Sequence, residues 1–184
     1  GHSIELTIAD AKLWSPSSPH LYDIEAVLLD AADKELDRVR SYAGIRSVGK
    51  VKDADGHWRF TLNGKPIFHW GPLDQGWWPD GLLTPPSEEA MVSDIQFLKD
   101  AGFNMIRPWR RPPAPMWLDL ADEMGVLIVG SPVLECMRLP LSTPYLPARV
   151  EREIRETVLR DRNRACVVQW ELFNELHRPI LKQM

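Results

Sequence analysis

The chain has 184 residues, of which 44% are hydrophobic and 26% are charged, and its formal net charge is -4. This size allows one ordinary domain or two small ones, and the composition is typical of a globular protein. The charge provides no basic footprint for nucleic acid, and no apolar run approaches the ~20 residues of a membrane span. We therefore expect neither nucleic acid nor a membrane as a partner.

The two cysteines, Cys136 and Cys166, are too few to indicate a disulfide framework. Free cysteine is among the most buried residue types, so we interpret both as small buried residues near strands. The cellular compartment is not predicted by the sequence.

Residues 1–49 have the pattern of β-structure. Alternating apolar residues predict strands at residues 5–8, 21–29 and 35–48, with a turn-rich loop at 14–19. Three strands leave two open edges and half a core. This segment is therefore predicted to be the end of a β-sandwich whose other strands lie outside it.

Residues 50–184 alternate between strand and helix patterns. Asn-Gly at the turn predicts a hairpin over residues 60–68, with its second arm continuing to residue 71. Ser87 is predicted to cap a helix that Gly102 ends. The pattern then predicts a strand at 104–107, a helix at 114–124, a strand at 126–129, a helix at 149–162 and a strand at 166–173. This order predicts a parallel sheet with right-handed crossovers.

Six of the eight tryptophans lie between Trp58 and Trp117. Such a density indicates either a core or a platform for a ligand, and the apolar faces of sugar rings stack on indoles. We favour a core position for Trp14, Trp58 and Trp117. Trp77 and Trp78 stand between turn residues on a loop, where sugar contact is the favoured alternative.

Several motifs, in order along the chain, together resemble one enzyme family. Those near the N-terminus are Leu13-Trp14-Ser15-Pro16 and Pro19-His20-Leu21-Tyr22, and the later ones are the hairpin at 60–68, the loop at 73–81, the strand motif at 102–107, Arg160-Asp161-Arg162-Asn163 and the strand ending at 170–175. The chain resembles glycoside hydrolase family 2, which holds β-galactosidases, β-glucuronidases and β-mannosidases.

The resemblance implies a multi-domain α and β fold. Residues 1–49 would be the C-terminal strands of an immunoglobulin-like β-sandwich, and residues 50–184 the N-terminal half of a (β/α)8 TIM-barrel catalytic domain. Family members are retaining exo-acting β-glycosidases that hydrolyse terminal β-linked sugars with two carboxylates ~5–5.5 Å apart. A carbohydrate is therefore the expected partner, and no cofactor is expected.

The resemblance also assigns roles to site residues. Glu175 matches the catalytic acid/base, and Asn174 resembles the residue that binds the sugar 2-hydroxyl. Arg107 resembles the arginine that orients the nucleophile. Two alternatives stay open: Glu175 as a helix cap and Arg107 as a structural ion-pair partner.

Three further residues are weaker candidates for substrate binding. Glu135 resembles a site glutamate that binds Mg²⁺ in some β-galactosidases, but the histidine that accompanies it there is absent here. One carboxylate does not hold Mg²⁺, so no metal is expected. Asp74 and Trp109 are candidate sugar contacts.

Arg110 and Arg111 stand where the family usually has a histidine-bearing segment. They suit an anionic glycan, since guanidinium groups pair with carboxylates. The alternative, which we favour, is a solvated loop.

No candidate for the nucleophile follows Glu175. Glu171 lies four residues earlier in the same strand, ~13 Å away, so we interpret it as a barrel-interior or ion-pair residue. The nucleophile is then expected outside this chain, which would be inactive as given. The alternative function is a non-catalytic carbohydrate-binding or assembly fragment, and exposed barrel edges predict a homo-oligomer or other association.

Overall fold

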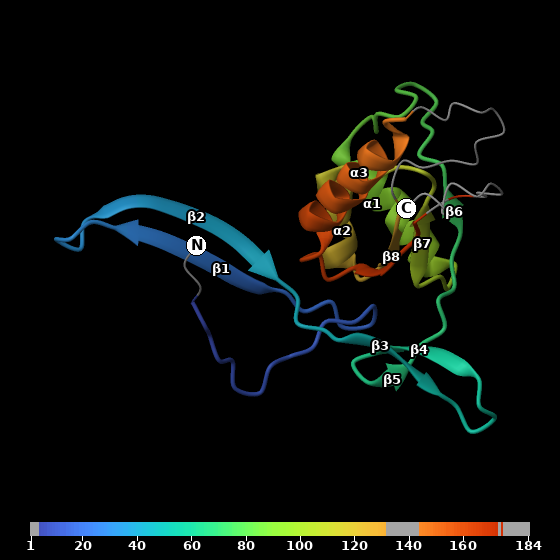
Figure 1. The fold of residues 1–184 in the computed structure, drawn as a ribbon, viewed down its shortest axis with the longest axis horizontal. Helices are drawn as coiled ribbons and strands as arrows, with labels where there is room; N and C mark the ends of the chain where they lie inside the picture. Colours follow the sequence, from blue (N-terminus) through green and yellow to red (C-terminus); the bar gives the residue numbers. More distant parts are fainter. Residues whose placement is uncertain (1–3, 132–143, 173, 175–184) are drawn as a thin grey trace.

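The computed structural model describes residues 4–131, 144–172 and 174. It contains a two-stranded ribbon, a three-stranded sheet and a four-stranded parallel sheet with helices beside it. In Figure 1 the ribbon projects away from the body that the helices and the parallel sheet form. The fold therefore has one extended part and one packed part.

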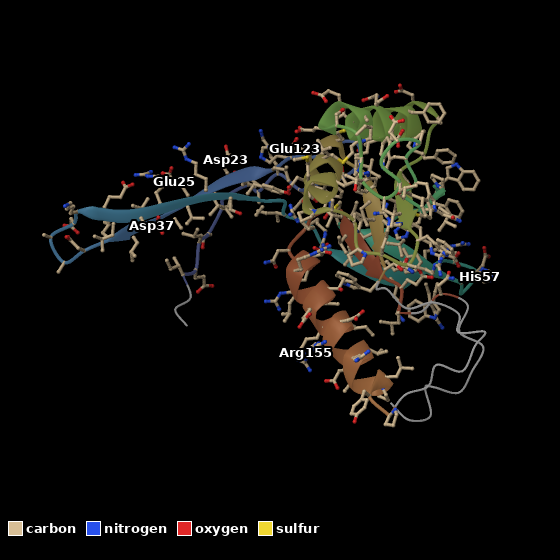
Figure 2. The ribbon with its side chains drawn as sticks, turned by 90° about the horizontal axis from the view of Figure 1, so that it is seen from above. Asp23, Glu25, Asp37, His57, Glu123 and Arg155 are labelled. Carbon is tan, nitrogen blue, oxygen red and sulfur yellow. The ribbon has the colours of Figure 1, made fainter. Side chains whose placement is uncertain are left out.

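The extended ribbon is the antiparallel pair β1 (Tyr22–Leu29) and β2 (Glu35–Ala43). Its turn is held by Asp30, whose Oδ1 accepts hydrogen bonds from the backbone N–H of Ala32 at 2.8 Å and of Lys34 at 3.0 Å. Figure 2 shows charged side chains along the ribbon, among them those of Asp23, Glu25 and Asp37.

Two expectations for this segment were wrong. Residues 5–8 form no strand, and Leu6 there is 78% exposed, because no neighbouring strand among the described residues pairs with this segment. The third predicted strand ends at Ala43, and a separate strand, β3 (Val48–Lys52), pairs with β4 (Trp58–Leu62) instead. The predicted domain boundary between residues 49 and 50 stays a prediction.

The Asn-Gly hairpin is confirmed. β4 pairs with β5 (Lys65–Pro66) around Asn63 and Gly64, whose φ angles of 53° and 75° suit the turn that Asn-Gly favours. The second arm is shorter than expected and ends at Pro66, and beyond it the Ile67 N–H still donates to the Phe60 carbonyl oxygen at 2.9 Å.

The four-stranded parallel sheet has the order β6-β7-β8-β9. Its strands are β6 (Leu73–Asp74), β7 (Met105–Pro108), β8 (Leu127–Gly130) and β9 (Val167–Trp170). The helices between them are α1 (Glu88–Asp100), α2 (Pro115–Met124) and α3 (Leu146–Asp161). This alternation confirms the predicted first half of a (β/α)8 barrel. None of the described helices is long and apolar enough to span a membrane.

The predicted helix ends are confirmed at α1 and α2. The Ser87 hydroxyl accepts a hydrogen bond from the Ala90 N–H at 3.2 Å, and the chain leaves α1 through Gly102 with a φ of 84°. Gly125 ends α2 with a φ of 74°. A Cβ at Gly125 would lie 2.6 Å from the Pro16 carbonyl oxygen, so this turn also allows the N-terminal loop to approach closely.

The core lies between the parallel sheet and the helices, and Trp14 of the N-terminal loop is part of it. Trp14 and Trp117 are buried as expected, and so is Cys166, whereas Cys136 lies outside the described residues. Trp58 is 59% exposed, so its expected core position was wrong. It lies on β4, beside the ammonium groups of Lys50 and Lys52 on the paired strand β3.

A buried polar junction joins the N-terminal segment to the barrel. The Trp14 indole N–H donates to the Asp122 carbonyl oxygen at 2.7 Å, and the Tyr42 hydroxyl lies 2.8 Å from Asp122 Oδ2. The Cys166 N–H donates to Asp122 Oδ1 at 2.7 Å. Burial raises the pKa of the Asp122 carboxyl, and the hydrogen bonds from Cys166 and Tyr42 and the charge of Arg164 oppose that rise.

Candidate active site

Polar side chains gather where the parallel strands end. Arg107 lies in β7, and Glu171 and Asn174 follow β9. The carboxyl ends of the strands of a (β/α)8 barrel lie at one face, which is the face that carries active sites. The structure therefore brings together two residues that the sequence predicted, Arg107 and Asn174.

Arg107 joins the two residues that follow β9. Its Nε donates to Glu171 Oε2 at 3.0 Å, and its Nη2 donates both to Glu171 Oε1 and to Asn174 Oδ1, the latter at 3.0 Å. The Arg107 and Glu171 side chains are 30% and 19% exposed. A two-point guanidinium–carboxylate contact fixes the plane of both groups, so the orientation of the Arg107 side chain relative to Glu171 is fixed.

The contact confirms that Glu171 is an ion-pair residue. Of the two interpretations of Arg107, the described residues support the ion pair, whose partner is Glu171. Its predicted contact with a nucleophile stays a prediction.

Asn174 is 5% exposed, and its amide orientation follows from Arg107. Because Oδ1 accepts from the guanidinium, the amide NH2 group is the end left to donate to another molecule. Asn174 directly precedes Glu175, which, like Glu135, lies outside the described residues. Arg107 of β7 therefore fixes the direction in which the Asn174 NH2 group points.

Asp74 is the last residue of β6, and Trp109 directly follows β7. Asp74 Oδ1 accepts from the Gly76 N–H at 2.7 Å, and the Trp109 N–H donates to the Asp74 carbonyl oxygen at 2.7 Å. The Arg110 guanidinium carbon lies 3.3 Å from the centre of the Trp109 ring. One face of that indole is thus covered by Arg110, which leaves less of Trp109 for a sugar than expected.

Arg110 and Arg111 lie on a loop, as the favoured interpretation expected, but both are half-buried rather than fully solvated. A neighbour that the sequence analysis missed is Asp94, which lines a cavity with Arg111. The available signal was its position three residues after Met91 and four before Leu98, within the apolar stripe of α1.

Among the described residues, one group of side chains is close enough to hold a metal ion: Asp53, Asp55 and His57. It lies in the turn between β3 and β4 rather than at the strand ends. Asp53 already accepts hydrogen bonds from the backbone N–H groups of Asp55 and His57 and pairs with Arg59 at 2.7 Å. These contacts hold the turn. They also lower the pKa of the Asp53 carboxyl, and the hydrogen bond from the His57 backbone N–H has the largest effect.

Two family models match the chain: glycosyl hydrolases family 2 over residues 1–46, and the TIM barrel domain of glycosyl hydrolases family 2 over residues 57–183. The chain belongs to glycoside hydrolase family 2. A β-galactosidase from Lactococcus lactis subsp. lactis is 31% identical over 182 residues, which cover 95% of this chain and 17% of that protein. A β-galactosidase from Pectobacterium atrosepticum is 33% identical over 180 residues, 94% of this chain and 16% of that protein.

Solved structures agree with the family assignment. A Ruminococcus gnavus β-glucuronidase in complex with uronic deoxynojirimycin has a TM-score of 0.82 and 29% identity, over 92% of this chain and 28% of its own. A Bifidobacterium dentium β-glucuronidase complexed with coumarin-3-O-glucuronide has a TM-score of 0.82 and 28% identity, over 91% and 26%. The chain thus spans about a sixth of the length of these curated family 2 relatives.

Proposed function

We propose that this family 2 chain supplies the acid/base half of the active site of a retaining β-glycosidase that removes terminal β-linked sugars. The observation that carries the proposal is the Arg107 contact, which holds Asn174 beside the end of β9, next in sequence to Glu175. Glu175 is the proposed acid/base, and a carbohydrate is the proposed substrate.

The chemistry has two steps. In the first, the protonated Glu175 gives its proton to the glycosidic oxygen as the bond to the anomeric carbon breaks and a carboxylate nucleophile bonds to that carbon. In the second, the Glu175 carboxylate takes a proton from a water molecule, whose oxygen displaces the nucleophile. One residue thereby serves as acid and then as base.

Asn174 is the proposed contact of the sugar 2-hydroxyl. Arg107 engages Oδ1, so the amide NH2 donates to the hydroxyl oxygen. A donor fixed before the substrate arrives loses little freedom as the transition state forms, and contacts to the 2-hydroxyl strengthen in that state. Glu171 supports this role as a positioning residue, because it fixes Arg107.

Glu171 is not the proposed nucleophile. It lies ~13 Å along the chain from Glu175, against the ~5–5.5 Å that a retaining pair needs, and Arg107 already holds both its oxygens. The nucleophile is therefore assigned to other residues of the polypeptide. Inactivity of the 184-residue chain by itself stays a prediction.

A second candidate function is a carbohydrate-binding or assembly module without catalysis. It is favoured by the exposed apolar side chains of the β1–β2 ribbon, which suit association with other strands. Leu28, Leu36 and Val39 are between 58% and 60% exposed.

The test combines intact mass with turnover of aryl β-galactosides, β-glucuronides and β-mannosides by the complete polypeptide that carries these residues. Glu175→Gln should abolish most turnover, whereas Glu156→Gln on the exposed face of α3 should leave it unchanged. Full activity of Glu175→Gln would overturn the proposal. Turnover by a 21.1 kDa species would overturn the assignment of the nucleophile to other residues.

A further inference from the structure

A cavity of about 240 Å³ lies outside the barrel interior, between the loop after β6 and helices α1 and α2. Its wall includes Ile106 of β7, and successive side chains of a strand point to opposite faces. Arg107, the next residue, contacts Glu171 on the other face. The cavity and the candidate active site are therefore on opposite sides of β7.

Arg111 lines this cavity and gives it a positive charge. Its Nε is buried and has no hydrogen-bond partner, and its side chain makes no ion pair within the described part of the chain. A buried donor without a partner is costly, so the side chain of Arg111 is placed in the cavity wall without a full set of hydrogen bonds.

The loop after β6 is built around this guanidinium. A Cβ on Gly76 would lie 1.3 Å from Arg111 Nη2, so only glycine permits the contact, and the φ of Gly76 is +69°. The guanidinium is therefore held in the cavity wall by backbone that no other residue type could provide.

Two carboxylates line the same cavity, Asp74 and Asp94. Burial raises the pKa of Asp94, and the charge of Asp74 raises it further. Carboxylates accept hydrogen bonds from hydroxyl groups, and a guanidinium donates to them. One cation and two carboxylates suit a ligand with many hydroxyls, whereas an added anion would meet repulsion.

Three indoles, those of Trp77, Trp78 and Trp117, also line the cavity. Trp77 is 62% exposed, so a face of its indole is accessible to a ligand in the cavity. The volume lies below the ~300–1,000 Å³ of pockets for drug-sized ligands, so it suits a single ring.

We propose that this cavity is a second carbohydrate site that binds one neutral pyranose ring, with Arg111, Asp74 and Asp94 contacting its hydroxyls and Trp77 its apolar face. The site does not take part in bond cleavage. It does not depend on the role proposed for Glu175, so either proposal can fail without the other.

The test is equilibrium binding of methyl β-D-galactopyranoside and methyl β-D-glucopyranoside to the complete polypeptide carrying Glu175→Gln, by saturation-transfer NMR and calorimetry. Arg111→Met and Trp77→Ala should each weaken sugar binding at the cavity at least tenfold and leave binding at the active site unchanged. Their matched controls, Arg155→Met and Trp58→Ala, remove an exposed arginine and a tryptophan of similar exposure outside the cavity, and should change nothing.

A second arm separates this site from the active site. Arg107→Met should leave the sugar binding that depends on Arg111 unchanged. Arg111→Met in the otherwise unaltered polypeptide should leave turnover of aryl glycosides within twofold. Loss of all sugar binding in Arg107→Met would overturn the proposal. So would unchanged binding in folded Arg111→Met and Trp77→Ala, or binding of methyl β-D-glucuronide alone.

Discussion

The β1–β2 ribbon and the parallel sheet are both rich in apolar residues, but they bury them to very different extents. In the ribbon, Leu36 is 60% exposed, whereas in the sheet Ile106 and Ile128 are fully buried. The ribbon is held by its backbone ladder and by exposed ion pairs such as Arg40–Glu25 at 3.1 Å. Such pairs contribute little, so the comparison teaches that stability here resides in the layer between sheet and helices.

The largest expected effect compares the same substitution in the two parts. Leu118→Ala removes a fully buried side chain of α2 and should lower the free energy of unfolding by about 2–5 kcal/mol. Leu36→Ala, in the exposed ribbon, should change it by less than about 0.5 kcal/mol. Urea denaturation followed by circular dichroism measures both. Equal losses would mean that the ribbon is covered in solution.

The next effect concerns the strand ends. Arg107→Met removes the two-point contact with Glu171 and the donor to Asn174, and kcat/KM should fall on the order of 100-fold, about 2.7 kcal/mol. Arg107→Lys keeps the charge but not the fork, so it should not restore activity. Steady-state kinetics of the complete polypeptide provide the measurement, and full rescue by lysine would refute the geometric role.

A pH-dependent effect is expected at the junction between the two parts. Because burial raises the pKa of Asp122 from its usual 3.8, the folded chain keeps this proton at pH values where the unfolded chain has lost it. The stability contributed by this carboxyl is therefore fully present at low pH and falls as pH rises above about 3.8 through the folded pKa.

Asp122→Asn tests that sign, because an amide does not titrate. The difference in unfolding free energy between Asp122→Asn and the unaltered chain should move in favour of the variant as pH rises from about 4 to about 7. Denaturation at several pH values measures it. A difference that stays constant would show that Cys166, Tyr42 and Arg164 fully offset the burial of the charge.

The smallest effect lies on the outer face of α3. Arg155 pairs with Glu151 at 3.1 Å, and both side chains are about two-thirds exposed. Figure 2 labels Arg155 on this helix. Arg155→Ala should cost only about 0.3–0.5 kcal/mol, less at high salt, as a shift of the urea midpoint would show. A loss above about 1 kcal/mol would mean that this face packs against something.

Local chemistry explains why much of the fold was predictable. Ser87 caps α1, Gly125 ends α2, and Asn63-Gly64 turns the β4–β5 hairpin, each because of backbone preferences of a few adjacent residues. Strand lengths were less predictable. Residues 5–8 have a strand pattern without a partner, and Pro66 ends a strand whose apolar pattern continues.

The candidate site was predictable in part. Arg107 and Asn174 were found from motifs, and the structure brings them within 3.0 Å of each other. The bidentate contact between Arg107 and Glu171, and the cavity around Arg111, were not predictable as geometry. Both depend on segments that are distant in sequence and meet only when the sheet forms.

The sequence by itself determined the three helices, the strands β7 to β9, their order, the family and the residues at the strand ends, because these follow from local backbone preferences and short motifs. The tertiary structure alone decided that Trp58 is exposed, that Asp122 is a buried junction, and that Arg111 lines a cavity. The reason is that burial, ion pairing and pKa depend on neighbours from other elements, which the local sequence does not specify.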